Sequence, residues 1–346
     1  MSFNVTVQPS GRTYTANADE ALLAAAIRSG IGLPYGCKDG ACGSCKCKKI
    51  EGTVVHGPHQ LKALAHEEEA AGFILPCCGV AHSDVVIESR QVTDESAFPV
   101  KKMPTRVNSF AKASHDVMVM RLQLPAADVF KYHAGQYVEF LLRDGDRRAY
   151  SMANAPHTQA ENASIELHIR HMPGGKFTDH VFGAMKEKEI MRVEGPFGSF
   201  YLREDSTKPM VLLASGTGFA PIKAIIEHMQ FKRITRPAVL YWGGRRPADL
   251  YMNDWVMARV AEMPNLRYIP VISDALPDDA WTGRTGFVHK AVLQDVPDLS
   301  AHQVYACGAP IVVDSAQADY IAAGLPAEEF FADSFVTEKE KAQAVT

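Results

Sequence analysis

The stretch GCKDGACGSCKCK, residues 36–48, contains four of the seven cysteines of the chain. A chain of 346 residues can build a core without disulfides, so thiols this close together indicate a metal site. Cys37, Cys42 and Cys45 have the spacing C-x4-C-x2-C, which an iron–sulfur cluster of the two-iron type uses. A structural zinc site is the alternative, but zinc usually takes two C-x2-C pairs, and the sequence has no second pair.

A fourth thiolate has to come from elsewhere, and Cys77 and Cys78 are the candidates. Cys77 follows an apolar stretch, residues 73–75, that would anchor the returning chain, so we choose Cys77. Cys47 and Cys78 are interpreted as small buried residues. The loop is also rich in glycine, which permits a positive φ and lets backbone N–H groups turn inward. These glycines are Gly36, Gly40 and Gly43.

The composition bounds the class of protein. Hydrophobic residues make up 47% and charged residues 22%, which is ordinary for a globular chain, and the length predicts two or three domains. A net charge of −4 gives no sign of the excess of basic residues that nucleic-acid-binding proteins have. The N-terminus lacks the pattern of a signal peptide and no apolar run would span a membrane, so we expect a cytoplasmic protein.

Two polar, proline-containing segments divide the chain. We expect a linker over residues 94–103 and a second boundary within residues 202–210. The predicted domains are therefore 1–93, 104–203 and 208–346. In the first, an alternating stretch at the N-terminus predicts a hairpin, residues 18–31 have helical spacing, and the cysteine loop follows at once. This domain resembles a plant-type 2Fe–2S ferredoxin with a β-grasp fold.

The middle domain has strand-like segments with few helical signals, which favours a small antiparallel barrel. It contains Arg148-Ala149-Tyr150-Ser151 and, further on, two glycines before a helix whose N-terminus suits a phosphate. Together these resemble the FAD-binding domain of the ferredoxin–NADP reductase superfamily, whose motif is R-x-Y-S/T. The resemblance implies that Arg148 pairs with the FAD pyrophosphate, that Tyr150 lies against the isoalloxazine, and that Ser151 hydrogen-bonds near its N5.

The same resemblance implies further flavin-binding positions. The phosphate turn would consist of Gly174, Gly175, Lys176 and Thr178, and the preceding strand would supply His168. Near the C-terminus, Phe335 is the candidate for covering the other face of the flavin.

The third domain alternates buried strands with helical stretches, which predicts a doubly wound parallel sheet with its ligand at the carboxyl ends of the strands. Gly216-Thr217-Gly218 and Cys307-Gly308 follow two of these strands and resemble the nicotinamide domain of the same superfamily. The resemblance implies that the first turn passes the pyrophosphate and that Cys307 sits beside the nicotinamide. Arg245 and Arg246 would lie near the coenzyme ribose; we predict NADH, with NADPH as the alternative.

The resemblance covers residues 3–335 and implies an NAD(P)H-dependent flavin iron–sulfur reductase. Electrons would pass from NAD(P)H through FAD to the 2Fe–2S cluster and then singly to a protein acceptor, with Ser151 and Cys307 at the site of hydride transfer. The expected acceptor is the terminal component of a multicomponent aromatic-ring oxygenase. The alternative is a CDP-deoxysugar dehydrase, as for the CDP-6-deoxy-delta-3,4-glucoseen reductases. A binding module with vestigial sites is a third hypothesis, which predicts a colourless protein.

Overall fold

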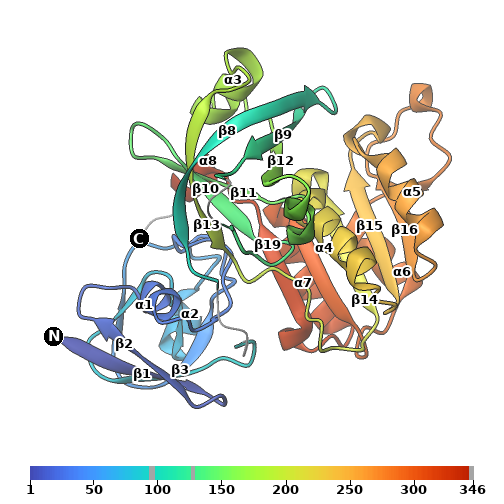
Figure 1. Cartoon of the computed structure of the whole chain (residues 1–346). Helices are drawn as coiled ribbons and strands as arrows, with labels where there is room; N and C mark the ends of the chain where they lie inside the picture. Colours follow the sequence, from blue (N-terminus) through green and yellow to red (C-terminus); the bar gives the residue numbers. More distant parts are fainter. Residues whose placement is uncertain (93–97, 126–128, 343–346) are drawn as a thin grey trace. The chain divides into compact units, whose positions relative to one another are not determined.

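A computed structural model describes residues 1–92, 98–125 and 129–342 (Figure 1). Its internal contacts group the chain into two compact units. Unit 1 comprises Met1–Pro99, Gly198–Phe200 and Ala332–Thr346, and unit 2 comprises Val100–Phe197 and Tyr201–Phe331.

Unit 1 is built on a mixed five-stranded sheet with the order β2-β1-β7-β3-β5. β1 pairs antiparallel with β2 and parallel with β7, while β3 runs antiparallel to β7. Val5 and Val7 of β1 are fully buried, as the alternation of the N-terminal stretch predicts. The sheet strands are β1 (Ser2–Gln8), β2 (Arg12–Asn17), β3 (Cys47–Glu51), β5 (Phe73–Ile74) and β7 (Val85–Glu88).

One helix packs on this sheet, which makes the domain a β-grasp fold and confirms the prediction. α1 (Leu22–Arg28) buries Leu22 and Leu23, two apolar residues that its spacing places on one face. The other elements of unit 1 are β4 (Val54–His56), α2 (His66–Ala70), β6 (Gly79–Ala81) and α8 (Glu338–Ala342), of which β4 and β6 form a separate pair.

Unit 2 begins with a six-stranded antiparallel sheet of order β11-β10-β13-β8-β9-β12. A bridge between Met152 and Leu167 joins the first strand of this order to the last, so the sheet closes into the predicted barrel. Its elements are β8 (Lys101–Lys112), β9 (Val117–Gln123), β10 (Tyr137–Leu141), β11 (Arg147–Ser151), η1 (Pro156–Ala160), β12 (Ser164–Arg170), α3 (Lys176–Gly183) and β13 (Ile190–Phe197).

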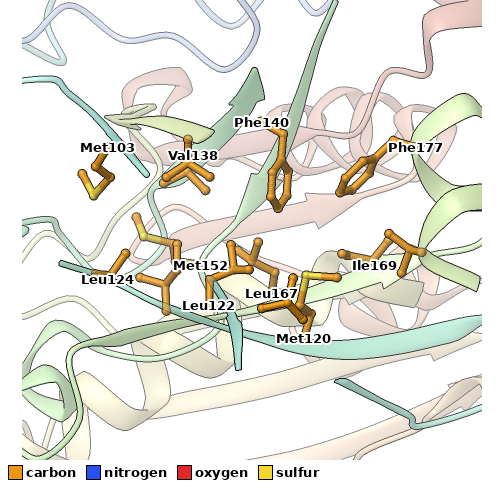
Figure 2. Close-up of a cluster of buried hydrophobic side chains, with 14 of the residues drawn as sticks. Met103, Met120, Leu122, Leu124, Val138, Phe140, Met152, Leu167, Ile169 and Phe177 are labelled. Atoms are coloured by element: carbon orange, nitrogen blue, oxygen red, sulfur yellow. The ribbon is translucent and has the colours of Figure 1, made fainter. Parts of the chain in front are cut away.

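Buried apolar side chains from β8, β9, β10, β12 and β13 fill the barrel interior, and the half-buried Tyr150 of β11 packs against them; Figure 2 shows part of this cluster. Phe140 of β10 packs on Phe177 at the start of α3, with 4.5 Å between the ring centroids, so the helix is anchored in the barrel core. Apolar burial of this kind stabilises the fold by roughly 25 cal/mol per Å².

The second half of unit 2 is a sheet of order β17-β16-β15-β14-β18-β19. β14 pairs in parallel with both β15 and β18, so the strand order reverses at β14, as in a doubly wound sheet. The strands are β14 (Met210–Ser215), β15 (Ala238–Gly244), β16 (Leu266–Ile272), β17 (Arg284–Thr285), β18 (Gln303–Gly308) and β19 (Phe330–Ser334).

Four helices and several short 3-10 turns connect these strands (Figure 1). They are η2 (Gly216–Gly218), α4 (Phe219–Lys232), η3 (Pro247–Asp249), α5 (Asn253–Glu262), η4 (Pro277–Asp279), α6 (Val288–Asp295), α7 (Pro310–Ala322) and η5 (Ala327–Glu329). The fold class predicted from the sequence is thus confirmed for all three parts of the chain.

The first strand of the barrel begins inside the predicted linker. Residues 94–97 of the linker lie outside the described residues, and β8 already begins at Lys101, where it pairs with Gly195 of β13. The last three residues of the predicted linker, 101–103, therefore belong to β8, because backbone pairing outweighs the weak periodicity there. Within the ranges that the structure describes, no helix has the length and apolar character needed to cross a membrane.

Candidate functional site

The four predicted cluster ligands gather in unit 1. The backbone N–H of Cys37 donates to Sγ of Cys42 and the N–H of Cys42 donates to Sγ of Cys37, both over 3.3 Å. A hydrogen bond with Cys37, followed by burial, raises the pKa of the Cys42 thiol well above its usual value. A hydrogen bond with Cys77 does the same for the pKa of Cys45. Cys37 also interacts with Cys77, so the four thiols form one connected group.

The loop geometry fits a bound cluster. Gly40 has φ of 75° and Gly43 has φ of 76°, conformations that other residues rarely adopt. A Cβ on Gly40 would lie 2.8 Å from Cβ of His59, so only glycine lets the loop pass this close to its neighbour. Four sulfur donors with inward N–H groups are the donor set that an iron–sulfur cluster requires.

Of the two remaining cysteines of unit 1, Cys47 is separate from these four thiols, whereas Cys78 forms a hydrogen bond with Cys77 that lowers the pKa of Cys78. Cys47 is buried, and burial is the cause that raises its pKa to about 12, with no thiol partner. Cys78 is half-buried, and its Sγ lies 3.8 Å from the carbonyl oxygen of Leu75. The position of Cys77 beside Cys45 and Cys37 is consistent with choosing Cys77 as the fourth ligand.

In unit 2, β11 and α3 bring the two cations of the predicted flavin site together. Nη2 of Arg148 donates to Oδ2 of Asp146 over 3.1 Å, and Nζ of Lys176 donates to the same oxygen over 3.2 Å. Lys176 also reaches Asp144 over 2.7 Å, which raises the pKa of the lysine. Two positive side chains beside a helix N-terminus suit a pyrophosphate.

The glycine turn before α3 is held by Thr178. Its Oγ1 donates to the carbonyl oxygen of Met172 over 2.9 Å and accepts the Met172 N–H over 3.2 Å. A Cβ on Gly175 would lie 2.8 Å from both the Met172 carbonyl oxygen and Thr178 Oγ1, whereas the space beside Gly174 is open. Thr178 thus shapes the turn, while the open side at Gly174 leaves room for a ligand.

The motif residues on β11 alternate in exposure. Tyr150 is half-buried with its ring 5.4 Å from that of Phe177, and burial raises the pKa of its hydroxyl. Ala149 is exposed and Ser151 is buried. Arg148 and Tyr150 are thus both half-buried and, two positions apart in the strand, lie on the same face of β11.

His168 of β12 does not face an open site. Its Nδ1 lies 2.8 Å from the Tyr251 hydroxyl and its Nε2 lies 3.2 Å from Oε1 of Glu166. Its side chain is completely buried, and burial lowers its pKa despite the neighbouring carboxylate. These contacts place His168 between the barrel and the parallel-sheet half of unit 2.

The two predicted nicotinamide turns meet at the carboxyl ends of β14 and β18. A Cβ on Gly218 would lie only 2.1 Å from the carbonyl oxygen of Cys307, so this position requires glycine. Gly308 has φ of 133°, and Ser215 Oγ accepts the N–H of Ala309 over 2.9 Å. Cys307 is buried at this junction, and Thr217 is 8% exposed. The turns form a narrow cradle at the switch point of the sheet.

The two arginines after β15 border a cavity of about 430 Å³. Arg246 makes a bidentate ion pair with Asp279, with distances of 2.8 Å and 2.6 Å. Arg245 is largely exposed, with Nε 3.6 Å from Asp249 Oδ2. Phe335, the remaining predicted flavin contact, is partly buried and belongs to the C-terminal segment grouped with unit 1.

The chain matches three family models along its length. Residues 5–82 match the 2Fe-2S iron-sulfur cluster binding domain, residues 104–201 the oxidoreductase FAD-binding domain, and residues 212–318 the oxidoreductase NAD-binding domain. The first match decides between zinc and an iron–sulfur cluster in favour of the cluster. Fold and domains together define an electron-transfer oxidoreductase with FAD, NAD and 2Fe–2S domains.

Relatives that match over nearly their full length show the family to which this chain belongs. The chain is 40% identical over 342 residues to the CDP-6-deoxy-L-threo-D-glycero-4-hexulose-3-dehydrase reductase of Yersinia pseudotuberculosis, covering 98% of this chain and 100% of that protein. It is 34% identical to terephthalate 1,2-dioxygenase reductase component 1 of a Comamonas species, covering 97% and 98%. The crystal structure of the Amycolatopsis cytochrome P450 reductase GcoB superposes with a TM-score of 0.78 at 31% identity, covering 96% and 98%.

The chain therefore belongs to the NAD(P)H-dependent flavin iron–sulfur reductases of the ferredoxin–NADP reductase superfamily that carry an N-terminal ferredoxin domain.

Several residues around the site were missed by the sequence analysis. Asp144 and Asp146 neutralise the predicted phosphate-binding cations, and Asp279 holds Arg246. Acidic residues in loops have no spacing that reveals their partners. Lys223 and Glu227 had a detectable signal, since they are charged residues spaced four apart within the mainly apolar first part of the helix.

Proposed function

We propose that this protein takes hydride from NAD(P)H and delivers electrons one at a time to a protein acceptor, through FAD and then the 2Fe–2S cluster. The observation that carries the proposal is that one chain combines a four-thiol group in unit 1 with a cationic pair and a glycine cradle in unit 2. When bound, FAD supplies the conversion of a two-electron donor into single electrons, and the cluster supplies a one-electron carrier.

The residues of the chain would bind and orient these groups. Cys37, Cys42, Cys45 and Cys77 would hold the cluster. Arg148 and Lys176 would pair with the FAD phosphates, while the Gly216–Gly218 turn and Gly308 would admit the coenzyme backbone closely. Ser151 and Cys307 would flank the reacting rings, and the buried position of both would keep water away from them.

The proposed acceptor is the terminal component of an oxygenase. The support is the full-length likeness to the reductase component of a terephthalate dioxygenase, together with the likeness in structure to a cytochrome P450 reductase. A dehydrase acting on a CDP-deoxyhexulose is the second candidate, which the 40% identity to the Yersinia reductase favours. We also propose that the protein works in the cytoplasm, where thiols stay reduced.

Reconstitution with purified candidate partners tests which protein accepts the electrons. The holoprotein is mixed with NADH and either purified terminal oxygenase components or a purified CDP-deoxyhexulose dehydrase, and coenzyme oxidation, dioxygen uptake and product are followed. An oxygenase partner gives product with matching dioxygen uptake. Product from the dehydrase under argon would instead support the second candidate. A holoprotein that oxidises neither NADH nor NADPH with cytochrome c as acceptor would contradict the proposed function itself.

A further inference from the structure

Helix α4 has two charged residues on a side that is otherwise apolar and buried. Lys223 is 4% exposed, and Glu227, one turn later, has a side chain that is 18% exposed. Their neighbours in the helix, among them Ile222 and Ile226, are fully buried. Burying an ammonium group is costly unless every hydrogen finds a partner, so these residues need a structural or functional reason.

Both side chains hold the main chain of a barrel segment. Nζ of Lys223 donates to the carbonyl oxygen of Ala153 over 3.0 Å and to Oε1 of Glu227 over 2.6 Å. The other carboxylate oxygen of Glu227 accepts the N–H of Ala155 over 2.9 Å. We call this set, Lys223 and Glu227 with the backbone of Ala153 and Ala155, the α4 clamp.

The clamped segment is itself fixed to the barrel. Ala153 N–H donates to the carbonyl oxygen of Glu166 on β12 over 2.7 Å, and the Glu166 N–H donates to Asn154 Oδ1 over 2.8 Å. The Tyr132 hydroxyl donates to the carbonyl oxygen of Asn154 over 2.9 Å. The α4 clamp therefore attaches α4 to a segment that is itself hydrogen-bonded to the barrel.

Glu166 links the α4 clamp to a second contact with the barrel, the one between His168 and Tyr251. Its Oε1 lies 3.1 Å from Nζ of Lys223 and 3.2 Å from Nε2 of His168, whose Nδ1 lies 2.8 Å from the Tyr251 hydroxyl. Burial raises the pKa of Glu166, but the hydrogen bond from His168 and the charge of Lys223 outweigh it and keep the carboxyl ionised. The buried ammonium thus has three partners for its three hydrogens.

Each side of the clamp lies next to one of the two predicted cofactor segments. Ala153 is two residues after Ser151, the end of the Arg148–Ser151 motif, and α4 follows directly on the Gly216–Gly218 turn. The position of α4 on the barrel therefore sets where that turn lies relative to the motif. Reaction rates depend steeply on such placement, since an error of about 1 Å can cost on the order of 100-fold.

We propose that Lys223 and Glu227 are positioning residues for hydride transfer, which place the coenzyme turn against the flavin-binding strand through the main chain of Ala153 and Ala155. The inference rests on the proposed function, because it assumes that hydride passes between groups bound at these two segments.

The test compares four variants of the FAD-loaded full chain. Lys223→Met and Glu227→Ala break the clamp, Glu227→Gln keeps an acceptor for the Ala155 N–H, and Lys232→Met changes an exposed lysine at the end of the same helix as a control. Anaerobic stopped-flow with the better of NADH and NADPH gives the maximal rate of reduction of the bound flavin and the apparent coenzyme Kd. Hydrogen exchange of the peptide that contains Ala155 reports the clamp without any catalysis.

Lys223→Met and Glu227→Ala should lower the maximal rate by about 10- to 100-fold. FAD content should stay at the wild-type level, and the coenzyme Kd should change far less than the rate. Glu227→Gln should retain most of the rate, and Lys232→Met all of it. Exchange at Ala155 should accelerate in Glu227→Ala and stay slow in Glu227→Gln.

Two results would overturn the inference. One is a wild-type rate in Glu227→Ala although its Ala155 exchange is fast. The other is a rate in Glu227→Gln as low as in Glu227→Ala although its Ala155 exchange is slow. If Lys223→Met does not fold, because it leaves the Glu227 carboxylate without the ammonium group that it pairs with, the two Glu227 variants decide alone. A wild-type protein whose flavin neither coenzyme reduces would contradict the proposed function and not the clamp.

Discussion

Arg148 and Lys176 share one carboxylate oxygen, Oδ2 of Asp146, at 3.1 Å and 3.2 Å. They lie on different elements, β11 and α3, so the fold assembles a pair of cations that neighbouring positions in the sequence do not provide. A pyrophosphate would find both positive charges close together beside the α3 N-terminus.

Arg148→Ala should therefore weaken FAD binding by about 10- to 100-fold, the usual effect of losing a hydrogen bond to a charged group. Arg143→Ala, at an exposed position before β11, is the matched control. FAD occupancy after dialysis and titration of the apoprotein with FAD measure the effect. Full occupancy in dialysed Arg148→Ala would count against this assignment.

Coenzyme choice can be predicted from the ion pair between Arg246 and Asp279. Because Asp279 takes both ends of the guanidinium, Arg246 is engaged, and an acidic neighbour disfavours a 2′-phosphate. We expect a higher kcat/KM for NADH than for NADPH. Asp279→Asn should raise the kcat/KM ratio of NADPH to NADH by roughly 10-fold, since it removes one charge from the pocket.

Asp278→Asn, at the exposed neighbouring position, should leave that ratio unchanged. A clear preference of the wild type for NADPH would show the prediction to be wrong. In that case Arg245→Ala or Arg246→Ala should cost mainly NADPH affinity.

His133 should contribute to the acid sensitivity of the barrel. Its ring stacks on Tyr201 with 4.4 Å between centroids, and burial, followed by the charge of Arg203, lowers its pKa to about 4. Between pH 6.5 and 4 the unfolded chain binds a proton here that the folded chain does not, so stability falls as the pH falls through this range. From pH 7 to pH 5 the loss is about 2 kcal/mol.

His133→Phe keeps a ring against Tyr201 but cannot titrate. Its loss of stability between pH 7 and pH 5 should be smaller by about that 2 kcal/mol. The urea concentration at which bound FAD is released, measured at both pH values, gives the comparison. An unchanged pH dependence would mean that His133 titrates alike in the folded and unfolded chain.

Local patterns in the sequence predicted most of the architecture. The spacing of Cys37, Cys42 and Cys45 is a short-range feature, and the alternation of residues 2–8 and the apolar strand before Gly216 are local as well. Each predicts its element without knowledge of the partner, and the closed barrel and parallel sheet follow from how such elements can pair.

Interactions between distant residues could not be predicted in the same way. The environment of His168 depends on Tyr251, 83 positions later in the sequence. The side chain of Arg246 is fixed by its ion pair with Asp279, 33 positions later. The start of β8 at Lys101 depends on Gly195 of β13. Only the folded topology brings these residues together, and a single sequence contains no local signal for them.

The four-thiol group allows the two halves of the reductase to be separated. Cys42→Ser should damage the cluster, because a hydroxyl is a far poorer iron ligand than a thiolate at neutral pH. The variant should change from brownish to flavin yellow and should still be reduced by NAD(P)H. It should also still pass electrons to small dyes that accept them from flavin, since the predicted flavin and coenzyme residues Arg148, Cys307 and their neighbours lie in unit 2.

Transfer to cytochrome c or to the physiological acceptor should largely disappear in Cys42→Ser. Cys47→Ser is the matched control, since Cys47 is equally a cysteine of unit 1 but is buried without a thiol partner. It should keep the visible absorbance of the cluster and the rate of cytochrome c reduction. Iron content, the visible spectrum and both acceptor assays give the comparison. Undiminished cytochrome c reduction in Cys42→Ser would contradict the ligand set, and so would loss of the cluster in Cys47→Ser together with its retention in Cys77→Ser.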